Sequence, residues 1–230
     1  EIVAQVIEMQ RVARAEDEAQ MAEGKRSKGD IQGVTNVVFM GMGEPLANYR
    51  NVIAAIRVLN DGQGLNIGAR HITVSTVGLV PQILQLAEEE LQINLAISLH
   101  APDNATRSQT MPVNKRYPVE ELIRACHKYA DATGRRIFFE YVLLKEQNDS
   151  VEQAQKLGRL LNGLHCHVNL IPVNPTKEGP FERTDLTAAK DFQGGLKQYG
   201  IPSTVRMEKG IDINAGCGQL RERAIEILGA

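Results

Sequence analysis

Strand-type and helix-type segments alternate along almost the whole chain, and this alternation constrains the fold more than any other feature. Short apolar or β-branched runs fall at 35–40, 71–75, 93–98, 137–143, 166–171 and 203–206. Between and around them, apolar residues recur every three or four positions at 1–20, 52–60, 83–91, 119–129, 151–161, 189–199 and 219–228. Such alternation predicts parallel strands joined by helical crossovers.

We therefore expect an α/β fold, a partial (β/α)6 TIM-like barrel. The chain opens directly on a helical pattern with no strand before it, so we expect the first strand of the barrel to be missing and the sequence to be a fragment. No GxGxxG fingerprint of a dinucleotide-binding fold is present. Ser150, with Gln153 three residues later, predicts a capping box at the start of one helix.

The amino-acid composition limits the classes of function that this protein could have. The 230 residues suffice for one large domain, and 43% hydrophobic with 23% charged residues is ordinary for a globular protein. A net charge of −2 gives no nucleic-acid signal, and the absence of Trp with 4% aromatic residues shows no stacking platform for bases. No apolar run has membrane-spanning length and no signal peptide is evident. Three widely separated cysteines indicate a reducing compartment, which we take as cytoplasmic.

The run Val-Val-Phe-Met-Gly-Met-Gly-Glu-Pro at 37–45 is the most informative local sequence. Four consecutive apolar residues predict a strand buried on both faces. Gly41 and Gly43 let the main chain turn sharply beside a ligand, and Glu44 places a carboxylate at the carboxyl end of the strand, where parallel α/β folds bind ligands. That carboxylate suits an ammonium group. A glycine-rich strand exit with a solvated Glu fits the local pattern equally well.

Other strand ends also carry small polar groups, namely Ser75, Ser98, His100, Glu140 and Asn174. Each has an ordinary structural explanation, such as a turn residue, a helix cap or a core histidine. Their recurrence at successive strand ends favours a shared ligand site at the carboxyl edge of the sheet.

Cys217 differs from the other cysteines because small residues flank it in Asn-Ala-Gly-Cys-Gly-Gln-Leu at 214–220. Its thiol is expected to be accessible, and a helix beginning just after it would lower the thiol pKa. A loop cysteine without a role remains equally compatible with the local sequence. Cys126 on an apolar helix face and Cys166 at a strand start are predicted to pack in the core.

Five motifs, in this order, resemble the radical S-adenosylmethionine (SAM) RNA methyltransferases that modify carbon 2 of adenine in 23S rRNA and tRNA. They are Phe-Met-Gly-Met-Gly-Glu-Pro-Leu at 39–46, Ser-Thr-Val-Gly at 75–78, Ser-Leu-His-Ala-Pro at 98–102, Pro-Val-Asn-Pro at 172–175 and Ala-Gly-Cys-Gly-Gln-Leu at 215–220. The first and last are specific, whereas the serine turns are weaker. The resemblance covers nearly the whole chain.

The resemblance implies a role for each motif. Gly43 and Glu44 would bind the amino group of SAM, and Ser75, Ser98, Leu99, His100 and Asn174 would complete the SAM pocket. Cys217 would be the catalytic cysteine. One SAM methylates it, and reductive cleavage of a second SAM starts radical transfer of that methyl group to adenine. Carbon 2 is a poor nucleophile, so a thiolate is needed to receive the methyl group first.

The resemblance also implies cofactors, partners and an organisation. The cofactors would be SAM and a [4Fe–4S] cluster. The partners would be the 23S rRNA and tRNA substrates and a flavodoxin-like electron donor. The enzyme would be a monomer that does not bind membranes. Residues 1–230 would form a single radical SAM core domain, truncated at its N-terminus, with 203–230 as an extension carrying the cysteine loop. Arg206, Lys209, Arg221 and Arg223 could contact RNA phosphates or could equally form a solvated face.

Several features of the family pattern are absent or changed in this sequence, and this limits the activity that we expect from it. The CxxxCxxC triplet that binds the cluster, the accessory domain with its general base, and the second reactive cysteine are not in this sequence, and Gly216 replaces the more usual Ala. We therefore expect the 230 residues alone not to generate the radical.

Three competing functions stay open at the level of sequence. The nearest is methylation of adenine carbon 8 of rRNA by the same mechanism. A non-catalytic SAM- or RNA-binding module is the second. A βα-barrel enzyme for a phosphorylated substrate is the third, and it would need a phosphate-binding glycine loop near the last strands. Gly194 and Gly195 fall inside a predicted helix, so the sequence gives that third function little support.

Overall fold

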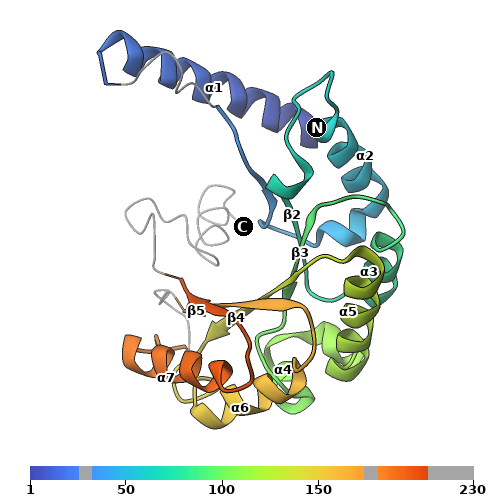
Figure 1. The fold of residues 1–230 in the computed structure, drawn as a ribbon, viewed down its shortest axis with the longest axis vertical. Coiled ribbons are helices and arrows are strands. Elements are labelled where there is room, and N and C mark those ends of the chain that lie inside the picture. The colour runs from blue at the N-terminus through green and yellow to red at the C-terminus, as the bar shows by residue number, and fades with distance from the viewer. Residues whose placement is uncertain (26–32, 174–180, 207–230) are drawn as a thin grey trace, which may run out of the picture.

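The computed structural model describes residues 1–25, 33–173 and 181–206 (Figure 1). One sheet holds six strands in the order β1-β2-β3-β4-β5-β6, and every neighbouring pair is parallel. The strands are β1 Val37–Phe39, β2 Ile72–Thr76, β3 Asn94–Ser98, β4 Ile137–Leu143, β5 Cys166–Pro172 and β6 Ser203–Val205. The sequential parallel order confirms the predicted partial barrel of βα units.

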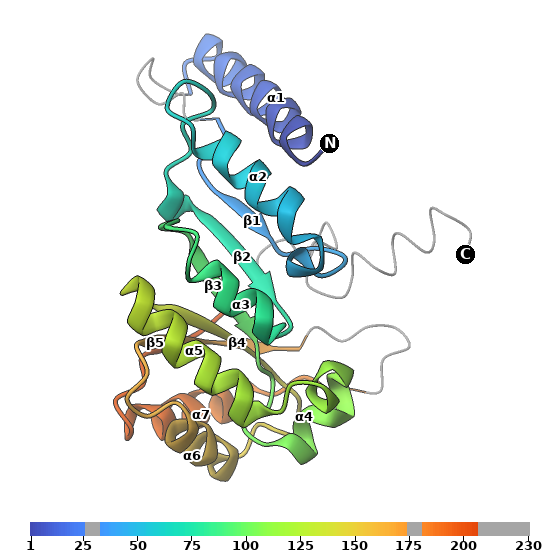
Figure 2. The same ribbon diagram turned by 90° about the vertical axis from the view of Figure 1, so that its right-hand side faces the viewer.

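Helical segments connect the strands. The α-helices are α1 Ile2–Ala22, α2 Tyr49–Asn60, α3 Val80–Leu86, α4 Asn104–Thr110, α5 Val119–Thr133, α6 Val151–Leu160 and α7 Leu186–Lys197. Short 3₁₀ segments are η1 Pro45–Asn48, η2 Ala69–His71 and η3 Pro112–Lys115. Figure 1 shows the strands and helices forming a crescent, with α2 to α7 on its convex side. The view in Figure 2 shows α2, α3 and α5 following one another along that side.

The core lies between the convex face of the sheet and the helices. Alternate strand residues such as Val74, Ile97 and Phe139 are fully buried there. They meet apolar helix residues such as Ile56 and Leu122, which share the same core. The period of two along the strands and about 3.6 along the helices therefore builds one continuous apolar layer.

The opposite, concave face carries the other set of strand residues, and many of these are polar. Strand register aligns Ser98 with Glu140, Glu140 with Asn169, and Asn169 with Thr204 across β3 to β6. Serine, carboxyl, amide and threonine groups thus form a row across four strands. A face with this composition is suited to a polar ligand more than to a second apolar layer.

The prediction that the first strand is buried on both faces is wrong for the described residues. Val38 is 58% exposed, whereas Val37 and Phe39 pack against the core. The reason is that Val38 points to the concave side, where it lines an open pocket between β1 and α1. A continuous apolar run therefore does not by itself show that both faces are covered.

Helix α3 is shorter than its apolar pattern predicts. The pattern extends to Leu91, but the helix ends at Leu86, and the acidic run Glu88-Glu89-Glu90 follows. Carboxylates at a helix C-terminus oppose the helix dipole, which disfavours continuation. Leu91 still packs against the core from the connecting segment, and this explains why the spacing is misleading.

The cap of α6 and the packing of α1 each match the sequence pattern only in part. Ser150 caps α6 by accepting from the Gln153 backbone amide at 3.2 Å. The Gln153 side-chain oxygen has no hydrogen-bond partner in the described part of the chain, so half of the capping box forms. Helix α1 packs against the core through Ile2, Val3 and Val6, while Met9, which has the same helical spacing, is 56% exposed. Among the described residues, no helix combines the length and the apolar character that crossing a membrane requires.

Candidate functional site

Glu44 connects the turn after β1 to the turn after β2. One carboxylate oxygen accepts from the Leu46 amide at 3.0 Å and so caps η1, while the other accepts from the Val77 amide at 2.8 Å. Two backbone donors fix the orientation of this carboxylate. Each oxygen keeps further acceptor capacity for an ammonium group. The alternative of a freely solvated Glu is therefore excluded.

Gly43 occupies a backbone conformation that favours glycine, with φ of +91°. A Cβ built at Gly43 or at Gly41 would meet no atom of the described residues within 4 Å, so among those residues open space adjoins this turn. Met40, Gly43 and Glu44 line a pocket of about 680 Å³ between β1, its following turn and α1. The turn thus presents backbone and one anchored carboxylate to space large enough for a small molecule.

Strand β2 ends with two hydroxyl residues that do different things. The Thr76 hydroxyl is buried and accepts from the Gly78 amide at 3.1 Å and the Leu79 amide at 3.4 Å. Val74 and Thr76, the neighbours of Ser75, are buried on the convex side, so the alternation of a strand places Ser75 on the concave side. There it is partly exposed. Within the described residues the Ser75 hydroxyl has no hydrogen bond that would prevent it from binding a ligand.

The turn after β3 holds three predicted ligand residues with distinct environments. Ser98 lies on the concave side, partly exposed. Leu99 is buried in the core, and its two backbone groups already bond to the Glu140 carbonyl (3.1 Å) and to Arg107 (3.1 Å). His100 has a φ of +59°, which is uncommon for a residue other than glycine and typical of strained functional turns.

His100 is held as a neutral imidazole. Its Nδ1 accepts from the Val142 amide at 3.2 Å, so the proton of the neutral ring resides on Nε2. Burial, and secondarily the nearby charge of Arg107, lower the pKa of His100 to about 4. The Asn148 side chain also donates to the His100 carbonyl at 2.9 Å, which secures the turn against β4.

Arg107 is a residue that the sequence pattern missed. It lies on α4, is fully buried, and donates to carbonyl oxygens of the turns after β2 and β3. An arginine within a polar connecting segment carries no local signal of burial, because most arginines there are solvated. Only the folded chain shows that α4 turns this side chain inward.

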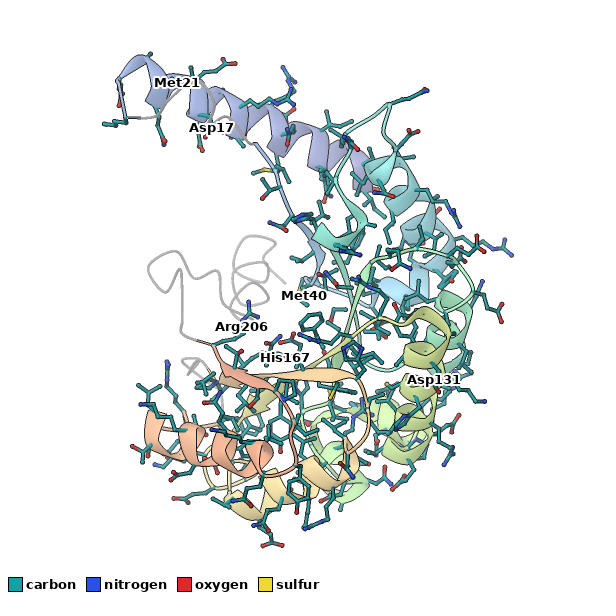
Figure 3. The ribbon with its side chains drawn as sticks, in the orientation of Figure 1. Asp17, Met21, Met40, Asp131, His167 and Arg206 are labelled. Carbon is teal, nitrogen blue, oxygen red and sulfur yellow. The ribbon has the colours of Figure 1, made fainter. Side chains whose placement is uncertain are left out.

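Glu140 on β4 faces the concave side beside Ser98 and Asn169. One oxygen accepts from the Asn169 amide group at 2.8 Å. The other is buried, has no hydrogen-bond partner among the described residues, and lies 4.0 Å from the Arg206 guanidinium. Burial raises the pKa of Glu140, against the opposing effects of Asn169 and Arg206. Figure 3 shows Met40, His167 and Arg206 along this concave side, and Asp131 on the convex helical side.

Cys126 and Cys166 are buried, which confirms their predicted packing in the core. Burial raises the pKa of both thiols, to about 11 for Cys166, so neither is a ready thiolate. Across the described ranges, no group of three His, Cys, Asp or Glu side chains is placed to hold a metal ion.

Two predicted site residues, Asn174 and Cys217, lie outside the described residues, as do Lys209, Arg221 and Arg223. The structure brings together the others: Gly43, Glu44, Ser75, Ser98 and His100 occupy the carboxyl ends of three neighbouring strands. Arg206, the remaining candidate, follows β6 on the concave side.

Comparison with known proteins gives strong matches. A probable dual-specificity RNA methyltransferase RlmN from Clostridium acetobutylicum is 53% identical over 208 residues, covering 90% of this chain and 60% of the relative. Another from Dictyoglomus turgidum is 55% identical over 188 residues, covering 82% of this chain and 54% of the relative. The chain thus spans little more than half the length of these curated relatives.

Solved structures agree with these matches. A radical SAM methyltransferase from Sphaerobacter thermophilus superposes with a TM-score of 0.84 and 49% identity, over 94% of this chain and 60% of that one. A domain of pyruvate-formate lyase-activating enzyme from Bacteroides vulgatus shares the fold, with a TM-score of 0.57 and 19% identity over 76% of this chain and all of that domain. The Radical SAM superfamily model matches residues 6–158. The chain therefore belongs to the radical SAM superfamily.

Proposed function

We propose that the protein containing this chain is an RNA methyltransferase that modifies carbon 2 of adenine in 23S rRNA and tRNA. The observation that carries the proposal is the convergence of Glu44, Ser75 and Ser98 at neighbouring strand ends in a chain about half identical to RlmN-named relatives. The superfamily implies SAM and a [4Fe–4S] cluster as cofactors. When bound, these would supply the methyl group and the radical.

The described residues fit SAM. Glu44, fixed by two backbone amides, would accept from the ammonium group of the methionine moiety, and Gly43 would let the backbone approach it. The hydroxyls of Ser75 and Ser98 are available on the concave face for polar groups of the same ligand. Leu99 would contribute through its position in the turn, since its side chain is buried and its backbone groups are engaged.

The described residues do not fit the cluster. An iron–sulfur cluster is bound by cysteine thiolates, whereas Cys126 and Cys166 are buried in the core with raised pKa values. The sequence has no CxxxCxxC triplet, and the relatives are considerably longer than this chain. We therefore place the cluster ligands elsewhere in the full-length protein and assign no reaction step to the described cysteines.

Other parts of the proposal come from the resemblance and the relatives. Cys217 would carry the methyl group as S-methylcysteine, and Asn174 would contact SAM. Residues 1–230 would form one core domain with 203–230 as its extension, although 203–205 also form β6 of the sheet. The enzyme would act as a cytoplasmic monomer with a flavodoxin-like electron donor, and the isolated 230 residues would be inactive.

The test is mass spectrometry of 23S rRNA and tRNA from cells that lack the full-length gene. We expect 2-methyladenosine to disappear, to return with the wild-type gene, and to stay absent with Cys217→Ala. Cys166→Ala is the matched control and should restore the modification, because Cys166 is a core residue. Loss of 8-methyladenosine instead, or no change in RNA, would contradict the proposal.

A further inference from the structure

We propose that Arg107 is a positioning residue for SAM binding, which fixes the turns after β2 and β3 relative to each other and to Glu44. The inference rests on the proposed function, because it concerns the same SAM site. Arg107 reaches no position on the concave face itself; it lies behind the turns, on α4. Its effect on the ligand would therefore be transmitted through the backbone that carries the ligand residues.

The hydrogen bonds of the guanidinium converge on those turns. Nη2 donates to the Val77 carbonyl at 2.7 Å and to the Ser98 carbonyl at 3.1 Å, and Nε donates to the Leu99 carbonyl at 3.1 Å. One planar group thus spans the ends of two neighbouring strands. The two strand ends cannot shift relative to each other without breaking at least one of these bonds.

Val77 extends this connection to the turn after β1. Its carbonyl accepts from Arg107, and its amide donates to the Glu44 carboxylate at 2.8 Å. A buried cation therefore binds the carbonyl, and an anchored anion the amide, of a single residue. All three turns that carry Gly43, Glu44, Ser75, Ser98 and His100 are joined in this way.

A second layer of bonds holds Arg107 itself. Nη1 donates to the Asn114 side-chain oxygen at 3.1 Å, and the Asn114 amide group donates to Ser108 at 2.8 Å and to Asn104 at 3.1 Å. Asn104 in turn accepts from the Val119 amide at 2.9 Å, at the start of α5. The guanidinium is therefore fixed from behind by α4, η3 and α5.

The geometry is specific for arginine. Its acceptors in the described residues are three carbonyl oxygens and one amide oxygen, which match a planar fork better than a compact ammonium group. Gly78, in the turn that Arg107 bonds to, has a φ of +104° that favours glycine, and a Cβ there would lie 3.0 Å from the Leu122 side chain. Burial lowers the pKa of Arg107 to about 10, which leaves it charged at neutral pH.

Arg135 provides a matched control at the other end of the same sheet. It donates to the Ile93 carbonyl at 3.3 Å and to the Asn94 side-chain oxygen at 2.7 Å, at the amino end of β3. It is thus also an arginine that ties a loop to β3 through oxygen acceptors. It differs in lying far from the turns that carry the predicted ligand residues.

The experiment compares Arg107→Lys, Arg135→Lys and wild type in the full-length protein. SAM affinity is measured by anaerobic isothermal titration calorimetry, and folding by thermal unfolding. We expect both substitutions to lower Tm, but Arg107→Lys alone to weaken SAM binding, by about tenfold or more, since it loses several charge-assisted hydrogen bonds. Arg135→Lys should change the dissociation constant by less than about twofold. Arg107→Met should weaken SAM binding at least as much as Arg107→Lys does.

Each of the other outcomes would overturn the role of Arg107, and one would also overturn the proposed function. Equal SAM affinity in folded Arg107→Lys and wild type, with Glu44→Ala weakened, would overturn the role of Arg107 and leave the proposed function intact. Equal weakening by Arg135→Lys would show a general stability effect and overturn the inference. A wild-type protein that does not bind SAM would overturn the proposed function and the inference together.

Discussion

Phe138 and Phe139 are consecutive and identical in residue type, yet they belong to two different environments. Phe139 is fully buried on the convex face of β4, within the core shared with the helices. Phe138 is partly exposed on the concave face, where its ring contacts His167 at a centroid distance of 5.9 Å. The comparison extends to the whole sheet, whose convex residues are mainly apolar, with Thr76 as a polar exception, and whose concave residues include Ser98, Glu140 and Asn169.

This difference shows how one sheet separates stability from binding. Apolar burial on the convex face supplies the dominant folding energy. The concave face can therefore hold polar groups that cost stability, such as the buried Glu140 oxygen that has no hydrogen bond among the described residues. Substitutions on the two faces should accordingly differ in what they impair.

The largest expected effect is on the convex face. Phe139→Ala should lower the free energy of unfolding by about 3–5 kcal/mol, through lost burial and the cavity left behind. Phe138→Ala should cost about 1–2 kcal/mol, because that ring is less completely removed from water. Urea unfolding of both variants measures the difference. Equal losses would mean that the two faces contribute alike to stability.

The second prediction concerns His100. Its pKa is lowered from 6.5 to about 4 by burial and by Arg107, so the unfolded chain binds its proton more readily than the folded one. Its contribution should therefore be neutral above pH 6.5 and should destabilise the fold progressively between pH 6.5 and 4, by about 3 kcal/mol at most. His100→Asn, which tolerates a positive φ, should show a shallower loss across that range in urea unfolding. An identical pH slope in the variant would refute the assignment.

The smallest effects come from two adjacent hydroxyls. Thr76→Val should cost about 1–3 kcal/mol of stability, because it leaves the Gly78 and Leu79 amides without their buried acceptor. Ser75→Ala should change stability by less than about 0.5 kcal/mol but weaken SAM binding by about 2- to 10-fold. Thermal unfolding and SAM titration of the two variants should therefore give opposite rankings. The same ranking in both assays would contradict the separation of the two faces.

Much of the fold could be predicted from the sequence because local patterns determine it. The apolar periods of Val52–Leu59 and 119–129 each predict a helix that the structure contains, and the six strand segments occur in the predicted order. The failures concern what apolar spacing leaves out. The exposure of Val38 depends on the open pocket beside β1, and the end of α3 depends on acidic residues that apolar spacing ignores.

The placement of the candidate site residues was predictable, although their roles stay predictions. Gly43 and Glu44 follow β1, Ser75 and Ser98 lie in the last residues of β2 and β3, and parallel strands necessarily bring those ends to one edge. The connections among them could not be predicted, because hydrogen bonds such as Glu44 to Val77 and Arg107 to Ser98 join residues from different βα units. The predicted roles of Asn174 and Cys217 stay predictions, because both lie outside the described residues.

The most direct test of the central claim is hydrogen–deuterium exchange of the full-length protein with and without SAM. The claim is that SAM binds at the carboxyl edge of the sheet, against the turns after β1, β2 and β3. We predict slower amide exchange on SAM addition in 41–46, 75–79 and 98–101, with no change at the amino edge around Arg135. Protection confined to other segments, or equal protection at both edges, would contradict the account.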